Sequence, residues 1–393
     1  MLPRPSFVGS VFALALTGVI AIACGGSGDS EFDENAQNAN GADGGGAGTD
    51  DTKFGGGDGT GNGDGTGNGG GTGSGEACVA QPAVAERAPA FLYFIFDRSG
   101  SMGRSPYGDP ATKLNPVKTA FSAFLKNASS KGISATLTYF PDVTKSTTQS
   151  CTASTYGTPA VGLSALPDRA DDFIRTLPTN PQSQLGDENY GTPTLAVVQG
   201  VLPKAKANSD AHKGKDSSKT AVVLLTDGDP MQCGGGNSAG AVATELAKYR
   251  SDVLTYVIGV GGSTNNLDAI AVGGGTGPKA MIVSVGDPAQ TERDLTAQID
   301  KIRLSSLSCD VAIPAPPTGQ TLDLNKVNVS FTPKGGTKSA LAYDQDCKAN
   351  GWKFDDAAKP TKISLCTCGD AQKDPGSAIV VEFGCARRES GIK

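Results

Sequence analysis

The sequence predicts an α/β fold built on a mainly parallel sheet, with a smaller β-rich module towards the carboxyl end. Two continuous apolar runs, at residues 91–96 and 220–226, are typical of strands that are buried on both faces. Predicted strands and helices alternate from residue 91 to residue 304, which favours parallel strands joined by right-handed helical crossovers. From Asp310 onward, short apolar strands and closely spaced cysteines replace this alternation.

The order of the predicted elements follows from the spacing of apolar residues. Strands are predicted at 91–96, 134–140, 220–226, 253–260 and 280–285, and helices at about 115–126, 171–177, 193–206, 241–250, 267–271 and 289–304. Asn115 is the expected N-cap of the first helix, and Pro116 suits its first helical position. The stretch 141–167 has no clear periodicity and is expected to consist mainly of loops.

Oxygen-bearing side chains follow the two most apolar strands. Asp97, Ser99 and Ser101 form a D-x-S-x-S pattern after the first of them, and Asp227 follows the second. Thr192 lies between the two strands, just before a predicted helix. Open α/β sheets bind their ligands at the carboxyl ends of strands. Carboxylate and hydroxyl oxygens suit a hard divalent cation such as Mg²⁺.

These three parts together resemble the metal-ion-dependent adhesion site (MIDAS) of the von Willebrand factor type A (vWA) family. That family combines D-x-S-x-S, a later threonine and T-D-G, which is 226–228 in this chain. The resemblance covers about 88–306 and implies a six-stranded doubly wound sheet with the five residues above as metal ligands. Mg²⁺ is the expected ion, with Mn²⁺ or Ca²⁺ as alternatives. It also implies that an acidic side chain of a protein partner completes the coordination. Arg98 departs from the small or apolar residue that is common at its position.

These features predict a metal-dependent protein-binding or adhesion module and not an enzyme. The net charge of −6 and the scattered basic residues argue against nucleic acid as a partner. The single histidine, His212, lies in a polar segment, which leaves Ser–His–Asp hydrolysis without a placed base. A metal-assisted hydrolase is the enzymatic alternative. The alternative from another class is a structural or assembly component of the cell envelope with an incidental, fold-stabilising metal.

The amino-terminal segment has the pattern of a bacterial lipoprotein signal. Residues 1–23 carry one charge, at Arg4, followed by an apolar run, and they end in small residues before Cys24. Ala21 stands where an aliphatic residue is usual in such a lipobox. We expect cleavage before Cys24 and a lipid on Cys24, which would anchor the chain to the membrane at the periplasmic face or the cell surface. The alternative is an ordinary secreted protein that is cleaved nearby.

Residues 24–77 form a glycine-rich segment with almost no apolar side chains. The hexapeptide Asp-Gly-Thr-Gly-Asn-Gly occurs at 58–63 and again at 64–69. A calcium-binding β-helix repeat would need a regular apolar position, and none is present. This composition predicts a disordered linker that tethers the vWA-like domain, predicted at 78–306.

The remaining eight of the nine cysteines predict disulfides in an exported chain: Cys78, Cys151, Cys233, Cys309, Cys347, Cys366, Cys368 and Cys385. The sequence leaves their pairing open. By resemblance to several vWA domains, Cys78 and Cys309 could join the ends of the central domain. Cys151 and Cys233 both lie in loops that we expect near the metal rim, and they could pair there. The other four would then pair within 307–393, a cysteine-rich module with strands predicted at 327–331, 363–365 and 378–383.

Overall fold

The computed structural model describes residues 81–84, 88–261, 266–313, 315, 322–374 and 376–389. The predicted signal peptide, Cys24, the predicted linker and Cys78 lie outside the described residues. None of the helices described there combines the length and the apolar character that a membrane span requires.

A six-stranded sheet forms the centre of the α/β domain, with the strand order β4-β3-β2-β5-β6-β7. Its strands are β2 (Ala90–Asp97), β3 (Ile133–Phe140), β4 (Val161–Ala165), β5 (Lys219–Thr226), β6 (Leu254–Val260) and β7 (Met281–Val283). β2 runs parallel to both β3 and β5, and β6 is parallel to β5 and β7. The α/β class is therefore confirmed.

The sheet differs from a clean parallel, doubly wound sheet at one edge. β4 pairs antiparallel with β3, so the sheet is mixed. The sequence does not predict β4, because only the first of its five residues, Val161, is buried and its apolar pattern is correspondingly weak. An antiparallel edge strand is a common addition to an otherwise parallel sheet.

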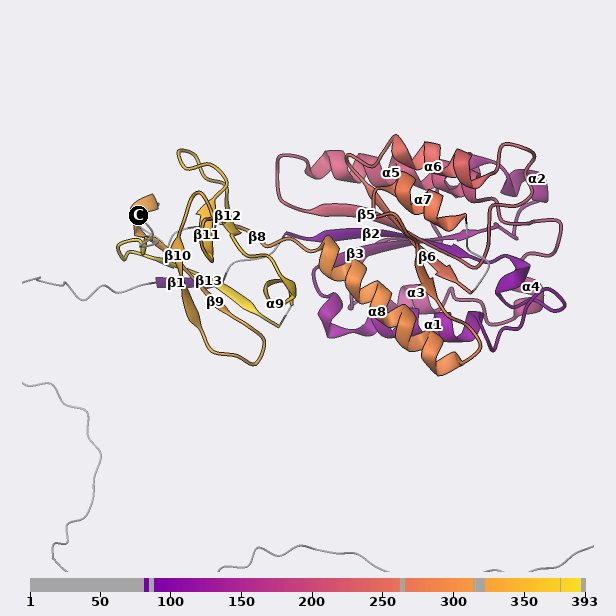
Figure 1. Cartoon of the computed structure of the whole chain (residues 1–393), viewed down its shortest axis with the longest axis horizontal. Helices are drawn as coiled ribbons and strands as arrows, with labels where there is room; N and C mark the ends of the chain where they lie inside the picture. Colours follow the sequence, from indigo (N-terminus) through magenta and orange to yellow (C-terminus); the bar gives the residue numbers. More distant parts are fainter. Residues whose placement is uncertain are drawn as a thin grey trace, which may run out of the picture. The chain divides into compact units, whose positions relative to one another are not determined.

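Helices cover both faces of this sheet (Figure 1). One face packs against α1 (Leu114–Lys126), α3 (Ala170–Ile174) and α8 (Pro288–Ser306), and the other against α5 (Thr194–His212), α6 (Ala239–Ala247) and α7 (Leu267–Gly274). Shorter helical segments are η1 (Gly100–Met102), η2 (Ala128–Ser130), α2 (Thr147–Ser150), η3 (Ala153–Tyr156) and α4 (Pro181–Gln184).

The two cores explain why the first strand is apolar without interruption. Successive side chains of a strand point to opposite faces of the sheet. Phe94 and its alternate neighbours in β2 therefore pack with α1, α3 and α8, while Tyr93 and its alternate neighbours pack with α5, α6 and α7. All eight residues of β2 are buried.

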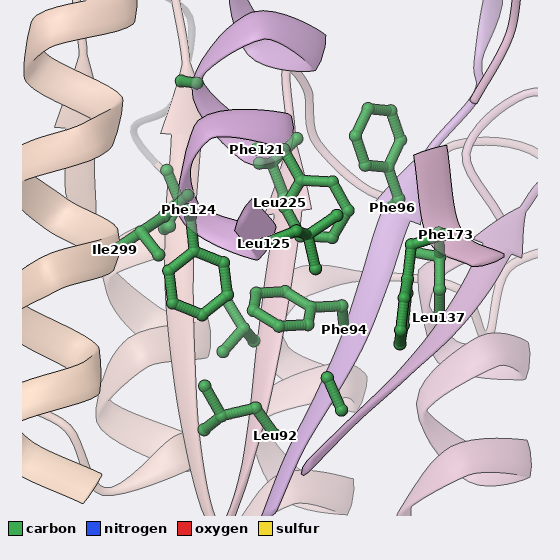
Figure 2. Packing of buried hydrophobic residues seen from close by; sticks show 14 of the residues in the cluster. Leu92, Phe94, Phe96, Phe121, Phe124, Leu125, Leu137, Phe173, Leu225 and Ile299 are labelled. Carbon is green, nitrogen blue, oxygen red and sulfur yellow. The ribbon is translucent and has the colours of Figure 1, made fainter. Parts of the chain in front are cut away.

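An aromatic cluster fixes α1 on the sheet, as Figure 2 shows. The Phe94 ring meets Phe121 edge-on at a centroid distance of 4.9 Å and Phe124 at 5.7 Å. Such edge-to-face pairs add to the apolar area that the three rings bury. This contact positions α1 against the strand that carries the D-x-S-x-S turn at its end.

The start of α1 differs from the prediction. The helix begins at Leu114, with Lys113 at the N-cap position, and no side chain caps it. Asn115 lies inside the first turn, where its backbone N–H donates a 2.8 Å hydrogen bond to the carbonyl of Pro110. The Pro110 carbonyl thus accepts a hydrogen bond from a first-turn N–H that a capping side chain would otherwise accept. Leu114 is fully buried, and its packing in the core explains why the helix begins at this residue.

The β-rich module is a seven-stranded sheet in the order β1-β13-β9-β10-β11-β12-β8. Its strands are β1 (Gln81–Val84), β8 (Asp310–Ala312), β9 (Val327–Thr332), β10 (Ser339–Tyr343), β11 (Gly351–Phe354), β12 (Lys362–Leu365) and β13 (Ala378–Phe383), with η4 (Leu324–Lys326) and α9 (Asp370–Lys373) between them. The three strands predicted here correspond to β9, β12 and β13.

The module contains residues that precede the α/β domain in the sequence as well as residues that follow it. β1, which precedes that domain in the sequence, pairs antiparallel with β13 near the carboxyl end. The core of the module centres on Trp352, which is fully buried and meets Tyr343 and Phe354 edge-on. The sequence does not predict β1, because its four residues include Pro82 and only one strongly apolar side chain, Val84.

The disulfides of the module correct one predicted pair. Cys309 bonds to Cys368, and therefore not to Cys78 as the resemblance suggested. The reason is the antiparallel pairing of β8 with β12, because Cys309 directly precedes β8 and Cys368 follows β12 by three residues. A second bridge joins Cys347 to Cys366, and Cys385 is disulfide-bonded as well.

We predict that Phe94→Ala lowers the free energy of unfolding by about 3–5 kcal/mol, because it leaves a cavity between β2 and α1. Phe94 is only 3% exposed. Val272→Ala is the control, since Val272 is 51% exposed and its truncation should change stability by about 0.5 kcal/mol or less. Urea unfolding of both variants measures the difference. Equal effects would contradict the packing described here.

Candidate metal site

Two carboxylates come together where adjacent parallel strands end. Asp97 is the last residue of β2, and Asp227 directly follows β5. The register pairs Phe96 with Leu225, so both strands end at the same edge of the sheet. Asp97 is fully buried and Asp227 is 6% exposed. Burying two carboxylates without compensation is costly, so their partners decide what this site can do.

The D-x-S-x-S turn is held tightly at that edge. The Ser99 backbone N–H donates to Asp97 Oδ1 at 2.7 Å, which closes the turn on its own carboxylate. The Gly186 N–H donates to the Arg98 carbonyl at 2.7 Å. A Cβ at Gly100 would lie 2.8 Å from the Gly186 oxygen, so only glycine fits at this position of the motif.

The serine hydroxyls converge on one oxygen of Asp227. Ser101 Oγ donates to Asp227 Oδ1 at 2.9 Å, Ser99 Oγ approaches the same oxygen at 3.4 Å, and the two hydroxyls are 3.1 Å apart. The Thr226 hydroxyl donates to Asp97 Oδ2. The structure thus brings four of the five predicted metal ligands into one cluster, which we call the Asp97–Asp227 cluster: Asp97, Ser99, Ser101 and Asp227.

Thr192, the fifth predicted ligand, is tied to the segment that follows Asp227. Its backbone forms an isolated bridge with Met231, through two hydrogen bonds of 3.1 Å. Gly191 has φ +57°, and a Cβ there would clash with Gln232. Thr192 is 5% exposed. Among the described residues, no hydrogen bond joins the Thr192 hydroxyl to the Asp97–Asp227 cluster.

A disulfide braces the loops beside the cluster. Cys151 bonds to Cys233, as the sequence analysis suggested. Cys151 lies in the segment after β3, and Cys233 lies two residues beyond Met231 in the segment after β5. The bridge therefore links two loops at the edge of the sheet that carries the cluster.

The two carboxylates perturb each other. Burial, and next the charge of Asp227, raise the pKa of Asp97 to about 7, while the hydrogen bonds from Thr226 and Ser99 act in the opposite direction. A carboxyl group in this state retains its proton until near neutral pH. A cation that binds the cluster must therefore compete with that proton.

Asp227 has a positively charged partner within the protein. Lys113 Nζ lies 2.7 Å from Asp227 Oδ2, and the Asp227 side chain is fully buried in this pair. The lysine thus contacts one carboxylate oxygen while the serines contact the other. Sequence reasoning missed Lys113, because a lysine before a helix carries no motif and its reach to Asp227 depends on the tertiary fold.

Arg98 has a bracing role away from the cluster. Its guanidinium lies over the Tyr139 ring at 4.6 Å, and Nη2 approaches the Pro141 carbonyl at 3.4 Å and Asp142 at 3.7 Å. Burial lowers the pKa of Arg98. Within the described chain, the Arg98 side chain makes no hydrogen bond or ion pair to the cluster. Its guanidinium instead contacts β3 and the loop that follows it.

The donor set of the cluster fits a hard divalent cation. It offers two carboxylates and neutral hydroxyls, and Mg²⁺ is commonly bound through one or two carboxylates with several waters retained. No three His, Cys, Asp or Glu side chains cluster as a metal site in the part of the chain that the structure describes. A cation here would therefore depend on Ser99, Ser101 and water as well as on Asp97 and Asp227.

Comparisons with known proteins give distant structural likeness. No family model and no curated protein matches the sequence. The fold is similar to the pilus adhesin SpaC from Lactobacillus rhamnosus GG, with 13% identity over 78% of this chain and 40% of that chain and a TM-score of 0.38. It is also similar to a von Willebrand factor type A protein from Catenulispora acidiphila, with 14% identity, 79% and 60% coverage, and a TM-score of 0.32.

An adhesive tip pilin from Group B Streptococcus agalactiae is a third similar structure. It shares 9% identity with this protein over 79% of this chain and 82% of that chain, at a TM-score of 0.32. This protein spans less than two thirds of the SpaC chain and of the type A protein described above.

We predict that the metal-free protein loses stability as the pH rises from 5 to 7. Folding raises the pKa of Asp97 from the ordinary 3.8 to about 7, so the folded state binds the extra proton between these values. Its contribution is fully present below the unfolded pKa and is lost as pH rises through the folded pKa, with a slope of up to about 1.4 kcal/mol per pH unit.

Urea unfolding with a chelator, from pH 5 to 8.5, measures this slope. Asp97→Asn should remove the contribution of Asp97, whereas Asp355→Asn should preserve it. Asp355 is a suitable control because its pKa is lowered to about 2, outside this window. An unchanged slope in Asp97→Asn would contradict the assignment.

Proposed function

We propose that this protein is an extracytoplasmic binding module that holds a divalent cation at the Asp97–Asp227 cluster and captures an acidic side chain of a protein partner through it. The observation that carries the proposal is the convergence of Ser99 and Ser101 on Asp227 Oδ1 at the end of β5. Mg²⁺ is the preferred ion, with Mn²⁺ and Ca²⁺ as alternatives. Thr192 is the proposed fifth ligand.

The chemistry of the ligands suits capture of an anion. Asp97 and Asp227 together balance a dication, while the hydroxyls of Ser99 and Ser101 add no charge. A cation held by few charged ligands keeps a strong attraction for a further carboxylate, which can replace a coordinated water. In this proposal, the residues of the cluster orient the cation and the partner supplies the remaining anionic oxygen.

The position of the histidine supports binding rather than hydrolysis. The His212 ring lies 4.6 Å from the Phe91 ring, and its Nδ1 lies 2.8 Å from Asp216 Oδ2. Phe91 and Asp97 stand six residues apart along β2, a distance of roughly 20 Å at about 3.3 Å per residue. The single histidine of the chain is therefore at the far end of that strand from Ser99, and we propose no enzymatic reaction.

The disulfides support a place outside the cytoplasm. Three bridges join described residues, and such bridges are typical of oxidising compartments. We propose that the chain is exported and that lipid on Cys24 anchors it to the cell envelope, on the pattern of residues 1–24. The Gly-rich segment 24–77 would then act as a tether.

One observation favours the second candidate, a structural envelope component with an incidental metal. Lys113 already supplies Asp227 with a positive charge. A protein whose cation only stabilises the fold would lose thermal stability on chelation, yet it would keep its partner. In the binding proposal, chelation removes partner capture itself.

We predict that the metal-stripped protein binds one equivalent of Mg²⁺ or Mn²⁺ and that Asp97→Ala abolishes this binding. Isothermal calorimetry measures both. Affinity should rise about tenfold per pH unit between pH 5 and 7, because one proton leaves Asp97, and should level off above this range. Asp187→Ala removes a carboxylate outside the cluster and should bind as the parent does.

Water proton relaxation of the Mn²⁺-loaded protein then tests whether one coordination position of the cation is occupied by exchangeable water. A coordinated, exchanging water gives enhanced relaxation, and added acetate should reduce it as carboxylate replaces that water. Stoichiometric binding that persists in Asp97→Ala would place the cation elsewhere and refute the proposed site. Enhancement that acetate leaves unchanged would argue against capture of an acidic group.

A further inference from the structure

The ion pair between Lys113 and Asp227 joins the start of α1 to the end of β5. Lys113 stands immediately before α1, and its ammonium meets the carboxylate that follows β5. A Cβ at Gly261 would lie 3.7 Å from Lys113 Cε, so the aliphatic part of the lysine passes beside the end of β6. The side chain thus reaches along the sheet edge into the Asp97–Asp227 cluster.

Lys113 is the cation that the fold itself supplies to this cluster. Asp227 forms one ion pair within the described residues, and Lys113 is its partner. Asp97 has hydrogen-bond donors but no ion pair among the same residues. The cluster therefore holds two carboxylates against one ammonium, and a buried carboxylate that lost this partner would be uncompensated.

A divalent cation and the Lys113 ammonium are rivals for the same carboxylate. Mg²⁺ coordinates oxygen at about 2.0–2.1 Å, so a cation held by Asp227, Ser99 and Ser101 would lie within a few ångströms of an ammonium that stayed on Asp227 Oδ2. Two positive charges at that separation repel, and the burial of the Asp227 side chain reduces the screening by water. The ammonium therefore has a reason to leave when the cation arrives.

The structure also gives Lys113 a way to leave. Its side chain is 23% exposed, whereas that of Asp227 is fully buried. Gly261 carries no side chain to enclose the lysine stem. Leu114, the next residue, is fully buried and fixes the backbone at the start of α1. The lysine side chain can therefore swing towards solvent without moving the helix.

We infer that Lys113 is an internal competitor of the divalent cation: its ammonium neutralises Asp227 in the metal-free protein and is displaced from this carboxylate when the cation binds. This inference rests on the proposed function, because it concerns the same site. Lys113 would then raise the cation concentration at which the site loads. Neither the D-x-S-x-S pattern nor the T-D-G pattern contains this residue.

The test compares cation affinity in Lys113→Met and Lys113→Arg with that of the parent. Lys113→Met keeps a similar length without charge, and we expect it to bind Mn²⁺ at least about tenfold more tightly by calorimetry. Lys113→Arg retains the charge and should bind no more tightly than the parent. Lys126→Met is the matched control, because Lys126 is at the other end of α1 and pairs with exposed Asp171.

A second measurement uses the unmodified protein and does not depend on how a variant folds. The metal-free and Mn²⁺-saturated proteins are treated briefly with acetic anhydride, and peptide mass spectrometry quantifies acetylation at Lys113. Displacement from Asp227 should raise the acetylation of Lys113 several-fold, while that of Lys126 stays constant. Unchanged acetylation of Lys113 at saturating Mn²⁺ would overturn the inference.

The outcomes separate this inference from the proposed function. If the parent binds Mn²⁺ and Lys113→Met binds equally or more weakly, the function stands and the competition is refuted. If Lys113→Met binds and the parent does not, Lys113 closes the site in the native chain, which refutes both the proposed function and the displacement of Lys113 by the cation. If neither binds, both are refuted.

Discussion

The structure of this domain depends on how two neighbouring carboxylates can be buried at one edge of a sheet. Asp97 and Asp227 follow adjacent parallel strands, so the fold places both charges where β2 and β5 end. Each charge is costly to bury alone. Ser99, Ser101, Thr226 and Lys113 surround the pair with donors, and burial together with Asp227 raises the pKa of Asp97. In the proposed function, a divalent cation would compensate this charge further.

The packing beneath the cluster keeps its parts in register. β2 is buried on both faces, and the contacts of Phe94 with Phe121 and Phe124 hold α1 against it. Lys113 stands at the N-cap position, immediately before α1. On the other face, the bridge between Cys151 and Cys233 holds the loops after β3 and β5. The two cores pack beneath the strand ends, while the side chain of Lys113 remains 23% exposed.

The sequence predicts the parts of this arrangement that depend on local pattern. Residues 91–96 and 220–226 are apolar enough to identify as buried strands, and the parallel sheet brings the residues after them together. Two contacts between distant segments were not predicted from the sequence. The antiparallel pairing of β8 with β12 selects Cys368 as the partner of Cys309, and the fold alone brings Lys113 to Asp227.

Local patterns also failed where an element was short or weakly buried. β4 exposes most of its residues, and β1 has four residues that pair with β13 far along the chain. At the start of α1, a good capping residue, Asn115, was outweighed by the burial of Leu114. In each case tertiary contacts decided an element or a boundary that local residue preference did not indicate.

We propose that the Asp97–Asp227 cluster holds a divalent cation in place of the Lys113 ammonium. Diffraction from crystals grown with Mn²⁺, with an anomalous difference map, tests it most directly. We expect one strong peak at the Asp97–Asp227 cluster, with Lys113 Nζ moved away from Asp227 Oδ2. A map with no peak there and Lys113 still paired to Asp227 would contradict it.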